Sequence, residues 1–301
     1  MKRIAITIGD PCGVGSEIIK SWANKNNVLL EKCLVIGDKN SLDSLPEEIQ
    51  KIYVGKKTFK ATLGNPSKTG AKIAYEALEV AAGLCIDGVC QGVVTAPISK
   101  ANMKSIGFGF DGHTEFFESK WNGNAVMCFA CKKLIVSLVT WHIALSKVSK
   151  NITKEKILRA IESANSLAEK LKKTKSAKIA VCGLNPHAGE DSLLGDEEAK
   201  LINPYLNSLR KSYKNLSEAL SPDTVFMRAL KNEFDAIVSM YHDQALAPLK
   251  TLYFDESVNI TMGLEHVRTS PDHGTAFSIA GKGIASDKSF ANAVSIAFKL
   301  I

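Results

Sequence analysis

Short apolar segments rich in β-branched residues alternate along this chain with longer segments of helical periodicity. Strands are predicted at residues 3–9, 33–37, 51–54, 91–96, 125–130, 133–140, 177–183, 234–240 and 258–263. Helices are predicted at 67–84, 153–171, 221–234 and 285–301, where apolar residues recur every three or four positions. Such alternation is typical of α/β folds with mostly parallel sheets and helices on both faces. The two neighbouring strands predicted within 125–140 indicate a hairpin, so we expect a mixed sheet.

The composition excludes several classes of protein. The 301 residues are 45% hydrophobic and 23% charged, which is ordinary for a globular chain and suggests about two domains. The net charge is only +7, and the densest basic stretch, 170–178, lacks interleaved aromatic residues, which indicates a solvated helix end. No apolar run reaches the ~18 residues of a membrane span, and the first residues resemble a strand more than a secretory signal. We therefore expect a cytoplasmic protein that binds neither nucleic acid nor membrane.

Two familiar kinds of motif are present only in part. Cys128 and Cys131 form a single C-x-x-C without a second pair at zinc-ribbon spacing, which favours packing over a metal or redox role. The seven cysteines are odd in number and stand mostly in apolar segments, which argues against a disulfide framework. Gly13 and Gly15 begin a G-x-G-x-x-G pattern, but Ile18 takes the place of the third glycine. This replacement disfavours a Rossmann dinucleotide site.

Three of the six histidines share one sequence context. His142, His187 and His242 follow the predicted strands that end at residues 140, 183 and 240. Their separations of 45 and 55 residues exclude a local metal motif but allow three strand ends to converge. Three imidazoles suit a divalent ion such as zinc, and Asp243 is the adjacent partner that such a site often has. The alternative is that each histidine has only a structural role.

A second set of polar residues indicates an anion site. Lys250, Asn259 and Arg268 follow the third of these strands and combine cationic groups with an amide. Such groups, meeting in a cleft, bind a carboxylate or phosphate. His113 and Thr114 follow a glycine-rich stretch and are expected to open a helix, where they offer further donors. The competing interpretation is ordinary surface residues and a plain helix cap.

Taken together, the motifs resemble those of a known family. In chain order they are GDPCGVGSE, TAPISK, GHTEFF, GLNPHAGE, SPDTVF, YHDQALAPLK and VNITMGLEHVRTSPDHGTAF. They resemble the 4-hydroxythreonine-4-phosphate dehydrogenases of pyridoxal phosphate biosynthesis over nearly the whole chain. The segment HGTAFSIAGKGIAS also resembles the adenosine-binding stretch of isocitrate and isopropylmalate dehydrogenases.

The resemblance implies a fold and a domain organisation. It implies two α/β/α domains with a cleft between them, of the isocitrate and isopropylmalate dehydrogenase type rather than the Rossmann type. The first domain is expected to comprise residues 1–111 together with 285–301. The second is expected to comprise residues 112–284 and to carry the metal, substrate and dimer contacts.

The resemblance also implies a role for each candidate site residue. One divalent ion (Zn²⁺, Mg²⁺ or Co²⁺), in a site completed across a homodimer interface, is expected on His142, His187 and His242. Substrate contacts are expected from His113, Thr114, Lys250, Asn259 and Arg268. Catalytic acid–base roles, or places beside the metal, are expected for Lys250, Asp223 and Asp243. The nicotinamide of NAD or NADP is expected beside Gly13 and Gly15, and its adenosine end beside His273, Gly274 and Thr275.

The implied reaction is an oxidative decarboxylation. The C3 hydroxyl of 4-phosphooxy-L-threonine, a phosphorylated hydroxy amino acid, is oxidised with NAD, and loss of carbon dioxide then gives 3-amino-2-oxopropyl phosphate. A related dehydrogenase acting on a four-carbon sugar-acid phosphate, threonate or erythronate 4-phosphate, is the alternative within enzymes. A non-catalytic protein that binds a phosphorylated metabolite or a metal on the same fold is the alternative from another class.

Overall fold

Residues 2–301 are described by a computed structural model, in which the chain divides into two compact units. Unit 1 comprises residues up to 125 together with 258–301, and unit 2 comprises residues 126–257. The expected boundaries, after residues 111 and 284, differ from this division, because residues 112–125 and 258–284 belong to unit 1. The reason is packing: Phe116, Phe117 and Trp121 enter the hydrophobic core of unit 1. Each unit is described by itself below.

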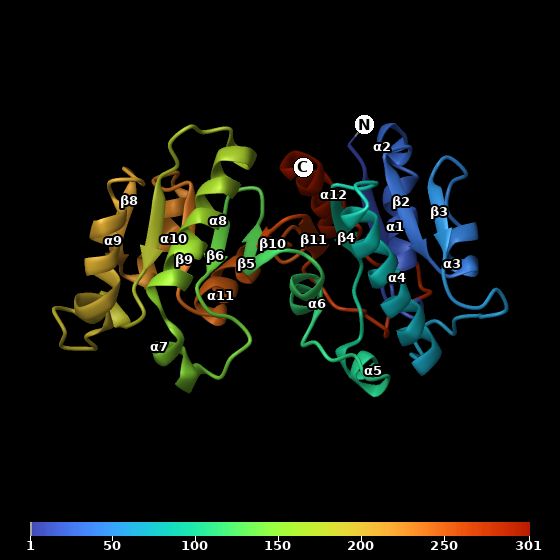
Figure 1. The fold of residues 1–301 in the computed structure, drawn as a ribbon, viewed down its shortest axis with the longest axis horizontal. Coiled ribbons are helices and arrows are strands. Elements are labelled where there is room, and N and C mark those ends of the chain that lie inside the picture. Colours follow the sequence, from blue (N-terminus) through green and yellow to red (C-terminus); the bar gives the residue numbers. More distant parts are fainter. Residues whose placement is uncertain (1) are drawn as a thin grey trace. The chain divides into compact units, whose positions relative to one another are not determined.

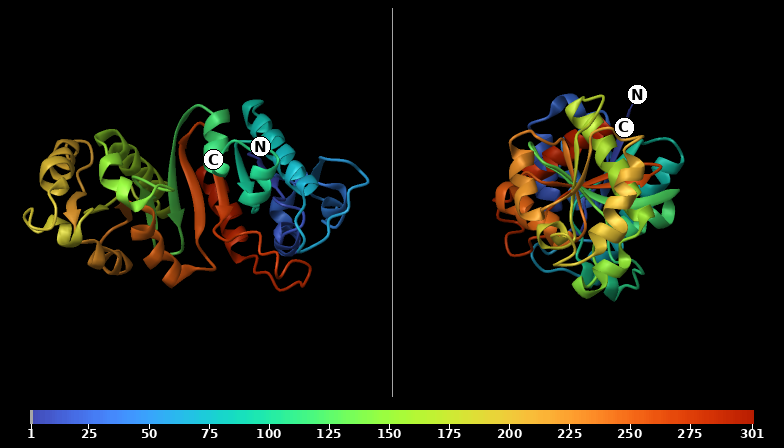
Figure 2. Two further views of the ribbon diagram at one scale, coloured as in Figure 1. Left: turned by 90° about the horizontal axis from the view of Figure 1, so that it is seen from below. Right: turned by 90° about the vertical axis from the view of Figure 1, so that its left-hand side faces the viewer.

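A mostly parallel sheet forms the centre of unit 1. Its strands are β1 (Ile4–Thr7), β2 (Cys33–Gly37), β3 (Gln50–Tyr53), β4 (Gly92–Thr95), β10 (Val258–Leu264) and β11 (Val267–Pro271). Their order in the sheet is β3-β2-β1-β4-β11-β10. All the neighbouring pairs are parallel except β10 and β11, which run antiparallel side by side (Figure 2).

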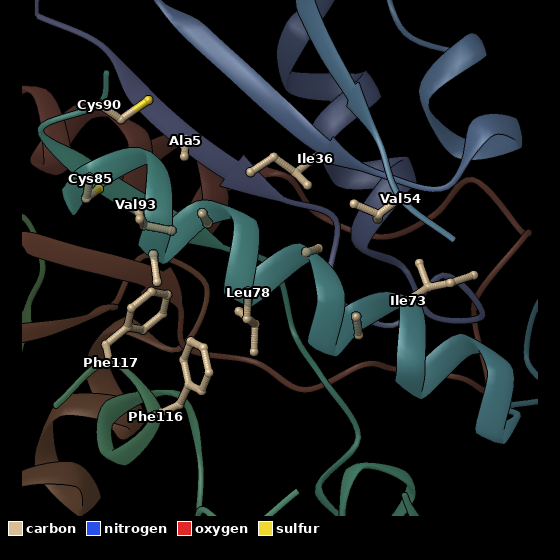
Figure 3. Close-up of a cluster of buried hydrophobic side chains, with 14 of the residues drawn as sticks. Ala5, Ile36, Val54, Ile73, Leu78, Cys85, Cys90, Val93, Phe116 and Phe117 are labelled. Atoms are coloured by element: carbon tan, nitrogen blue, oxygen red, sulfur yellow. The ribbon is translucent and has the colours of Figure 1, made fainter. Parts of the chain in front are cut away.

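Helices cover both faces of this sheet. They are α1 (Gly15–Ala23), α2 (Asn27–Leu30), α3 (Lys39–Asp43), α4 (Lys68–Ile86), α5 (Lys100–Ser105), α6 (His113–Lys120) and α12 (Lys288–Leu300). On one face α4 packs against Ala5, Ile36 and Val93, and the rings of Phe116 and Phe117 point from α6 toward α4 (Figure 3). On the other face α1 and α12 meet through an edge-to-face contact between Trp22 and Phe290, whose ring centres are 5.7 Å apart.

Unit 2 contains five neighbouring strands of mixed direction between two layers of helices. Its strands are β5 (Gly123–Ala130), β6 (Ile135–Leu138), β7 (Ile179–Cys182), β8 (Leu216–Leu220) and β9 (Ala236–Ser239), in the order β5-β6-β9-β7-β8. The helices are α7 (Val148–Asn151), α8 (Lys154–Lys172), α9 (Asn203–Leu209), α10 (Pro222–Leu230) and α11 (His242–Tyr253). Short 3-10 turns cover Leu145–Lys147 and Pro186–Gly189, and Glu198–Ile202 is a π-helical turn.

The alternation of side chains along the strands explains why both faces of this sheet are covered. Val136, Ala180 and Ile237 belong to one core cluster together with residues of α10 and α11. Their sequence neighbours on the strands point the other way, where the buried apolar stripe of α8 packs along β6 and β9 (Figure 1). The hairpin predicted within 125–140 is confirmed, since β5 and β6 pair antiparallel with Cys128 opposite Ser137.

Local sequence signals set where the longest helices begin. The side chain of Ser67 accepts a hydrogen bond from the backbone of Gly70 at the start of α4, and Thr153 caps α8 in the same way through Lys156. All seven cysteines are free thiols, as expected from their number and context. Among residues 2–301, no helix combines the length and apolar character needed to cross a membrane.

Candidate active site

A buried arginine is the centre of a polar cluster in unit 1. Arg268, on β11, is 4% exposed, and its backbone lies opposite Val93 of the parallel strand β4. Its side chain therefore reaches Thr95, whose Oγ1 accepts hydrogen bonds from Nε (3.1 Å) and Nη2 (2.8 Å). A third hydrogen bond runs from Nη1 to Oδ1 of Asn259 (2.9 Å). Within residues 2–301 these three bonds use three of the five guanidinium N–H groups.

The charge of Arg268 is held in a nearly dry environment. Burial lowers the pKa of Arg268 to about 9, although the nearby charge of Glu115 acts in the opposite direction. A guanidinium with this pKa is still charged at neutral pH. Since its hydrogen-bond partners Thr95 and Asn259 are both neutral, the cluster is suited to receive an anionic group.

His113 lies beside this guanidinium as the first residue of α6. Its Nε2 atom is buried and has no hydrogen-bond partner among residues 2–301. Burial, followed by the nearby charges of Arg268 and Lys100, holds the pKa of His113 well below its ordinary value of 6.5. The imidazole is therefore neutral at physiological pH, so it can donate or accept one hydrogen bond to a ligand through Nε2.

Thr114 occupies the next position on α6, close to β10. Its Oγ1 lies 3.4 Å from Oγ1 of Thr261, and the residue is almost fully buried. The predicted substrate residues His113, Asn259 and Arg268 thus meet in one part of unit 1, with Thr114 next to them in sequence. Thr95 belongs to the same cluster and was missed, although its place at the end of a buried strand was a usable signal.

The three candidate metal ligands follow three neighbouring strands of unit 2. The strands β6, β9 and β7 are adjacent in the sheet and mutually parallel, so their carboxyl ends lie at one edge. His142 stands four residues after the end of β6, His242 three after β9 and His187 five after β7. This edge is where open α/β sheets place their ligands.

Two of these imidazoles are close together. The ring centres of His142 and His242 lie 5.7 Å apart. Nδ1 of His242 is 2.7 Å from Oδ1 of Asp243, a contact that orients the ring and leaves Nε2 for another partner. Asp243 is 86% exposed, so this contact is an exposed one. A pair of imidazoles with one oriented by a carboxylate has the donor chemistry of a divalent-metal site.

His187 lies in the loop after β7 and does not join the pair to form a three-ligand group. Among residues 2–301, no three His, Cys, Asp or Glu side chains are arranged to hold a metal ion. His142 and His187 nevertheless share a feature that is rare for non-glycine residues: their φ angles are +43° and +49°. Backbone strain of this kind is found at functional sites, where the surrounding structure holds it in place.

Lys250 and Asp223, expected to act in catalysis, also belong to unit 2. Lys250 is half-buried on α11, two helical turns after His242, with Nζ 5.9 Å from the ring centre of Phe254. Asp223 is exposed at the start of α10, where its Oδ1 accepts a hydrogen bond from Oγ of Ser221 (2.6 Å). By contrast, the other four expected substrate residues all lie in unit 1.

The two segments expected to bind the cofactor meet in unit 1. The backbone N–H of Val14 donates to the carbonyl oxygen of Thr275 (3.0 Å), and a Cβ at Gly13 would lie 2.8 Å from that same oxygen. A Cβ at Gly15 would lie 2.0 Å from the carbonyl oxygen of Ile8, so this glycine lets α1 approach β1. Gly274 has open space around it instead.

Nearby, Nδ1 of His273 lies 3.0 Å from the carbonyl oxygen of Gly274, and its Nε2 atom is buried without a partner among residues 2–301. The fold and these clusters together define an α/β protein with a buried guanidinium in one unit and a pair of imidazoles at the sheet edge of the other.

Comparison with known proteins identifies the family. Residues 15–297 match the family model described as "Pyridoxal phosphate biosynthetic protein PdxA". A curated 4-hydroxythreonine-4-phosphate dehydrogenase from Sulfurihydrogenibium sp. (strain YO3AOP1) is 37% identical over 100% of this chain and 98% of its own length. The crystal structure of 4-hydroxythreonine-4-phosphate dehydrogenase from Klebsiella pneumoniae matches with a TM-score of 0.85 at 30% identity, covering 100% of this chain and 99% of that one. The chain belongs to the PdxA family and is an enzyme of the oxidoreductase class.

A more distant likeness confirms the fold type. Isocitrate dehydrogenase from Methylococcus capsulatus matches with a TM-score of 0.50 at 12% identity, covering 99% of this chain and 85% of that one. At this identity the likeness concerns the fold alone. It agrees with the expected isocitrate dehydrogenase-like architecture.

Proposed function

We propose that this protein catalyses the NAD-dependent oxidation of 4-phosphooxy-L-threonine at its C3 hydroxyl, followed by decarboxylation to 3-amino-2-oxopropyl phosphate. The observation that carries the proposal is the buried guanidinium of Arg268, which has neutral partners and N–H groups left for an anion. The substrate has two anionic groups, a phosphate and a carboxylate, and planar bidentate recognition of either suits arginine. The name shared by the curated relatives supports the same substrate.

The neutral imidazole of His113 complements the guanidinium. A cationic histidine beside Arg268 would add repulsion, whereas a neutral one supplies a hydrogen bond without further charge. The hydroxyl of Thr114 offers another donor on the same helix turn. We assign His113, Thr114, Asn259 and Arg268 to substrate binding, with Thr95 as the residue that orients Arg268.

We further propose that His142, His187 and His242 hold a divalent ion, Zn²⁺, Mg²⁺ or Co²⁺. A bound divalent ion supplies Lewis acidity, which lowers the pKa of a nearby hydroxyl and stabilises negative charge that develops on oxygen. The closeness of His142 and His242 and the contact of His242 with Asp243 support this assignment. Lys250, Asp223 and Asp243 are the groups we assign to proton transfer in the same unit.

A nicotinamide cofactor, NAD or NADP, accepts the hydride in this proposal. We place its nicotinamide beside Gly13 and Gly15 and its adenosine end beside His273, Gly274 and Thr275. The hydrogen bond between Val14 and Thr275 supports this placement, because it joins the two segments into one surface. The open space around Gly274 leaves room for a ligand there.

The active form is proposed to be a cytoplasmic homodimer with a shared active site. Large apolar side chains are exposed close in sequence to the candidate ligands: Ile143 and Leu145 follow His142, while Leu193 and Leu194 follow His187. Leu145 is 70% exposed and Leu193 is 80% exposed. Apolar exposure of this kind beside a site is typical of a surface covered by a partner.

The experiment compares two substrates in one assay. Formation of reduced nicotinamide is followed with 4-phosphooxy-L-threonine and, separately, with threonate 4-phosphate, in the presence of a divalent ion. The proposal expects much higher kcat/KM for the amino acid phosphate, with carbon dioxide released in equal amount to the reduced cofactor. Preference for threonate 4-phosphate would assign the chain to a sugar-acid phosphate instead. Binding of either compound without turnover would favour a non-catalytic role.

A further inference from the structure

A buried carboxylate lies beneath the loop that carries His187. Glu198, the first residue of the π-helical turn, is 2% exposed. Its Oε1 accepts hydrogen bonds from the backbone N–H groups of Leu184 (2.7 Å) and Asn185 (2.8 Å), and its Oε2 accepts one from Nδ2 of Asn185 (2.9 Å). Hydrogen bonds to an ionised carboxylate are stronger than neutral ones, so this set anchors the loop firmly at its start.

Three glycines stand close to this carboxylate or to its amide partner. A Cβ at Gly183 would lie 2.9 Å from Oε1 of Glu198, and a Cβ at Gly189 would lie 2.9 Å from Oε2. At Gly195 a Cβ would lie 2.3 Å from Nδ2 of Asn185. Backbone atoms stand equally close: a Cβ at Gly183 would lie 2.7 Å from Cα of Ala188, and one at Gly189 would lie 2.8 Å from the carbonyl oxygen of Gly195. Real Cβ atoms do not approach backbone atoms so closely, so these two glycines let the loop close around the carboxylate.

The segment between these glycines has an unfavourable backbone. Positive φ angles occur at His187 (+49°), Ala188 (+53°), Glu190 (+41°), Asp191 (+52°) and Ser192 (+72°), in addition to Gly189. Each such non-glycine residue costs on the order of 1 kcal/mol or more, and the strain persists only where neighbouring contacts hold it. Glu198 contacts the chain directly before this segment, at the backbone of Leu184 and at the backbone and side chain of Asn185, two residues before His187.

We propose that Glu198 is a positioning residue: its buried carboxylate fixes the start of the 183–189 loop and thereby restricts the positions that His187 can take as a metal ligand. The inference rests on the proposed function of His187 as a metal ligand. It assigns to Glu198 no contact with substrate, cofactor or metal. A carboxylate is needed because both of its oxygens accept hydrogen bonds. In the Glu198→Gln variant one oxygen still accepts, but the side-chain NH₂ group would face the Nδ2 donor of Asn185, so that hydrogen bond is lost.

The test uses the full-length protein with Glu198→Ala and Glu198→Gln, and with Glu155→Gln as the control. Glu155 is an exposed glutamate that pairs with Arg159 on α8 in the same unit. The first readout is amide hydrogen exchange without added metal. We expect Glu198→Ala to speed exchange at Leu184 and Asn185 by about tenfold, the cost of losing one charge-assisted hydrogen bond, while the amides of β7 and β9 stay protected.

The second readout is the binding of Co²⁺, followed by its absorption spectrum. Loss of a residue that orients a metal ligand typically weakens affinity by about 10- to 100-fold, and we expect that range for Glu198→Ala. Glu198→Gln is expected to recover part of the affinity and part of the protection, and Glu155→Gln to match the unchanged protein. If Glu198→Ala fails to fold, the same two readouts on Glu198→Gln decide the question.

The outcomes separate this inference from the proposed function. Unchanged exchange at Leu184 and Asn185 together with unchanged Co²⁺ affinity in the Glu198 variants would overturn the inference while leaving the metal site intact. Faster exchange throughout unit 2 would also overturn it, since Glu198 would then stabilise the whole unit. Failure of the unaltered protein to bind Co²⁺ would remove the proposed metal site, and the exchange of the loop amides alone would then show whether Glu198 orders the loop.

Discussion

Arg268 donates two hydrogen bonds to a single oxygen atom, Oγ1 of Thr95. The two residues are 173 positions apart in sequence and lie on neighbouring parallel strands. Because the acceptor is a hydroxyl, the contact fixes the plane of the guanidinium without neutralising its charge. The protein thus keeps an oriented cation buried in unit 1, and the account of substrate binding depends on this arrangement.

Replacing Arg268 by lysine keeps the charge but removes the planar set of donors. Losing a hydrogen bond to a charged group costs about 1.5–3 kcal/mol, so we expect kcat/KM to fall by about 10- to 100-fold, mainly through KM. Steady-state kinetics with the phosphorylated substrate measure this, with Arg159→Lys on the exposed face of α8 as the control. An Arg268→Lys enzyme with unchanged KM would show that the guanidinium does not bind the substrate.

Thr95→Val removes the acceptor of two Arg268 hydrogen bonds while keeping the shape of the side chain. Two buried N–H groups then lack a partner, and we expect the free energy of unfolding to fall by about 1–3 kcal/mol and KM to rise. Thr95→Ser keeps the hydroxyl and is expected to retain most of both properties. Urea denaturation and substrate kinetics on the two variants provide the comparison. Equal KM values for the valine and serine variants would contradict an orienting role.

The low pKa of His113 makes stability depend on pH in a defined direction. The folded state holds the pKa well below 6.5, so between these values the unfolded chain binds a proton that the folded chain does not. The free energy of unfolding therefore falls as the pH drops below 6.5, by up to about 1.4 kcal/mol per pH unit. Above pH 6.5 the stabilisation is fully present, and His113 adds no further pH dependence.

We expect His113→Asn to lose less stability than the unaltered protein between about pH 7 and about pH 5, because asparagine does not titrate. Urea denaturation at both pH values gives the difference directly. All other titrating groups are the same in the two proteins, so equal losses of stability would show that His113 titrates normally.

His187→Ala is expected to abolish turnover and leave the fold intact. The side chain is exposed and lies outside the core, and exposed substitutions typically change stability by no more than about 0.5 kcal/mol. A melting temperature close to that of the unaltered protein, combined with loss of activity, is the expected pair of results. Normal turnover by a folded His187→Ala enzyme would remove His187 from the proposed site.

The fold was predictable wherever hydrophobic patterning and caps agree. Helices α4 and α8 have both an apolar stripe and an N-terminal cap residue, and both are close to their expected bounds. Strand β11 was missed because its sequence, VRTSP, is polar. The strand is nevertheless buried, because its polar side chains form hydrogen bonds with other parts of the fold. For example, Oγ1 of Thr269 donates to the carbonyl oxygen of Ala293 (2.9 Å).

For the candidate site, the sequence predicted which residues lie close together only where these residues follow neighbouring strands of the sheet. His142 and His242 follow adjacent parallel strands, so their closeness follows from the strand–helix alternation. The position of His187 depends on a loop with positive φ angles, which residue types alone do not reveal. Thr95 and Glu198 were missed for a related reason: each acts through a partner brought near by the fold, and neither stands in a recognisable catalytic pattern.

The most direct test of the central claim is the dependence of turnover on a divalent ion. Protein treated with a chelator and then freed of it is assayed for reduced nicotinamide formation before and after addition of Zn²⁺, Mg²⁺ or Co²⁺. The account expects activity to disappear and to return with one of these ions, and not to return in His142→Ala or His242→Ala. Full turnover by the chelated protein, or restoration in both histidine variants, would contradict it.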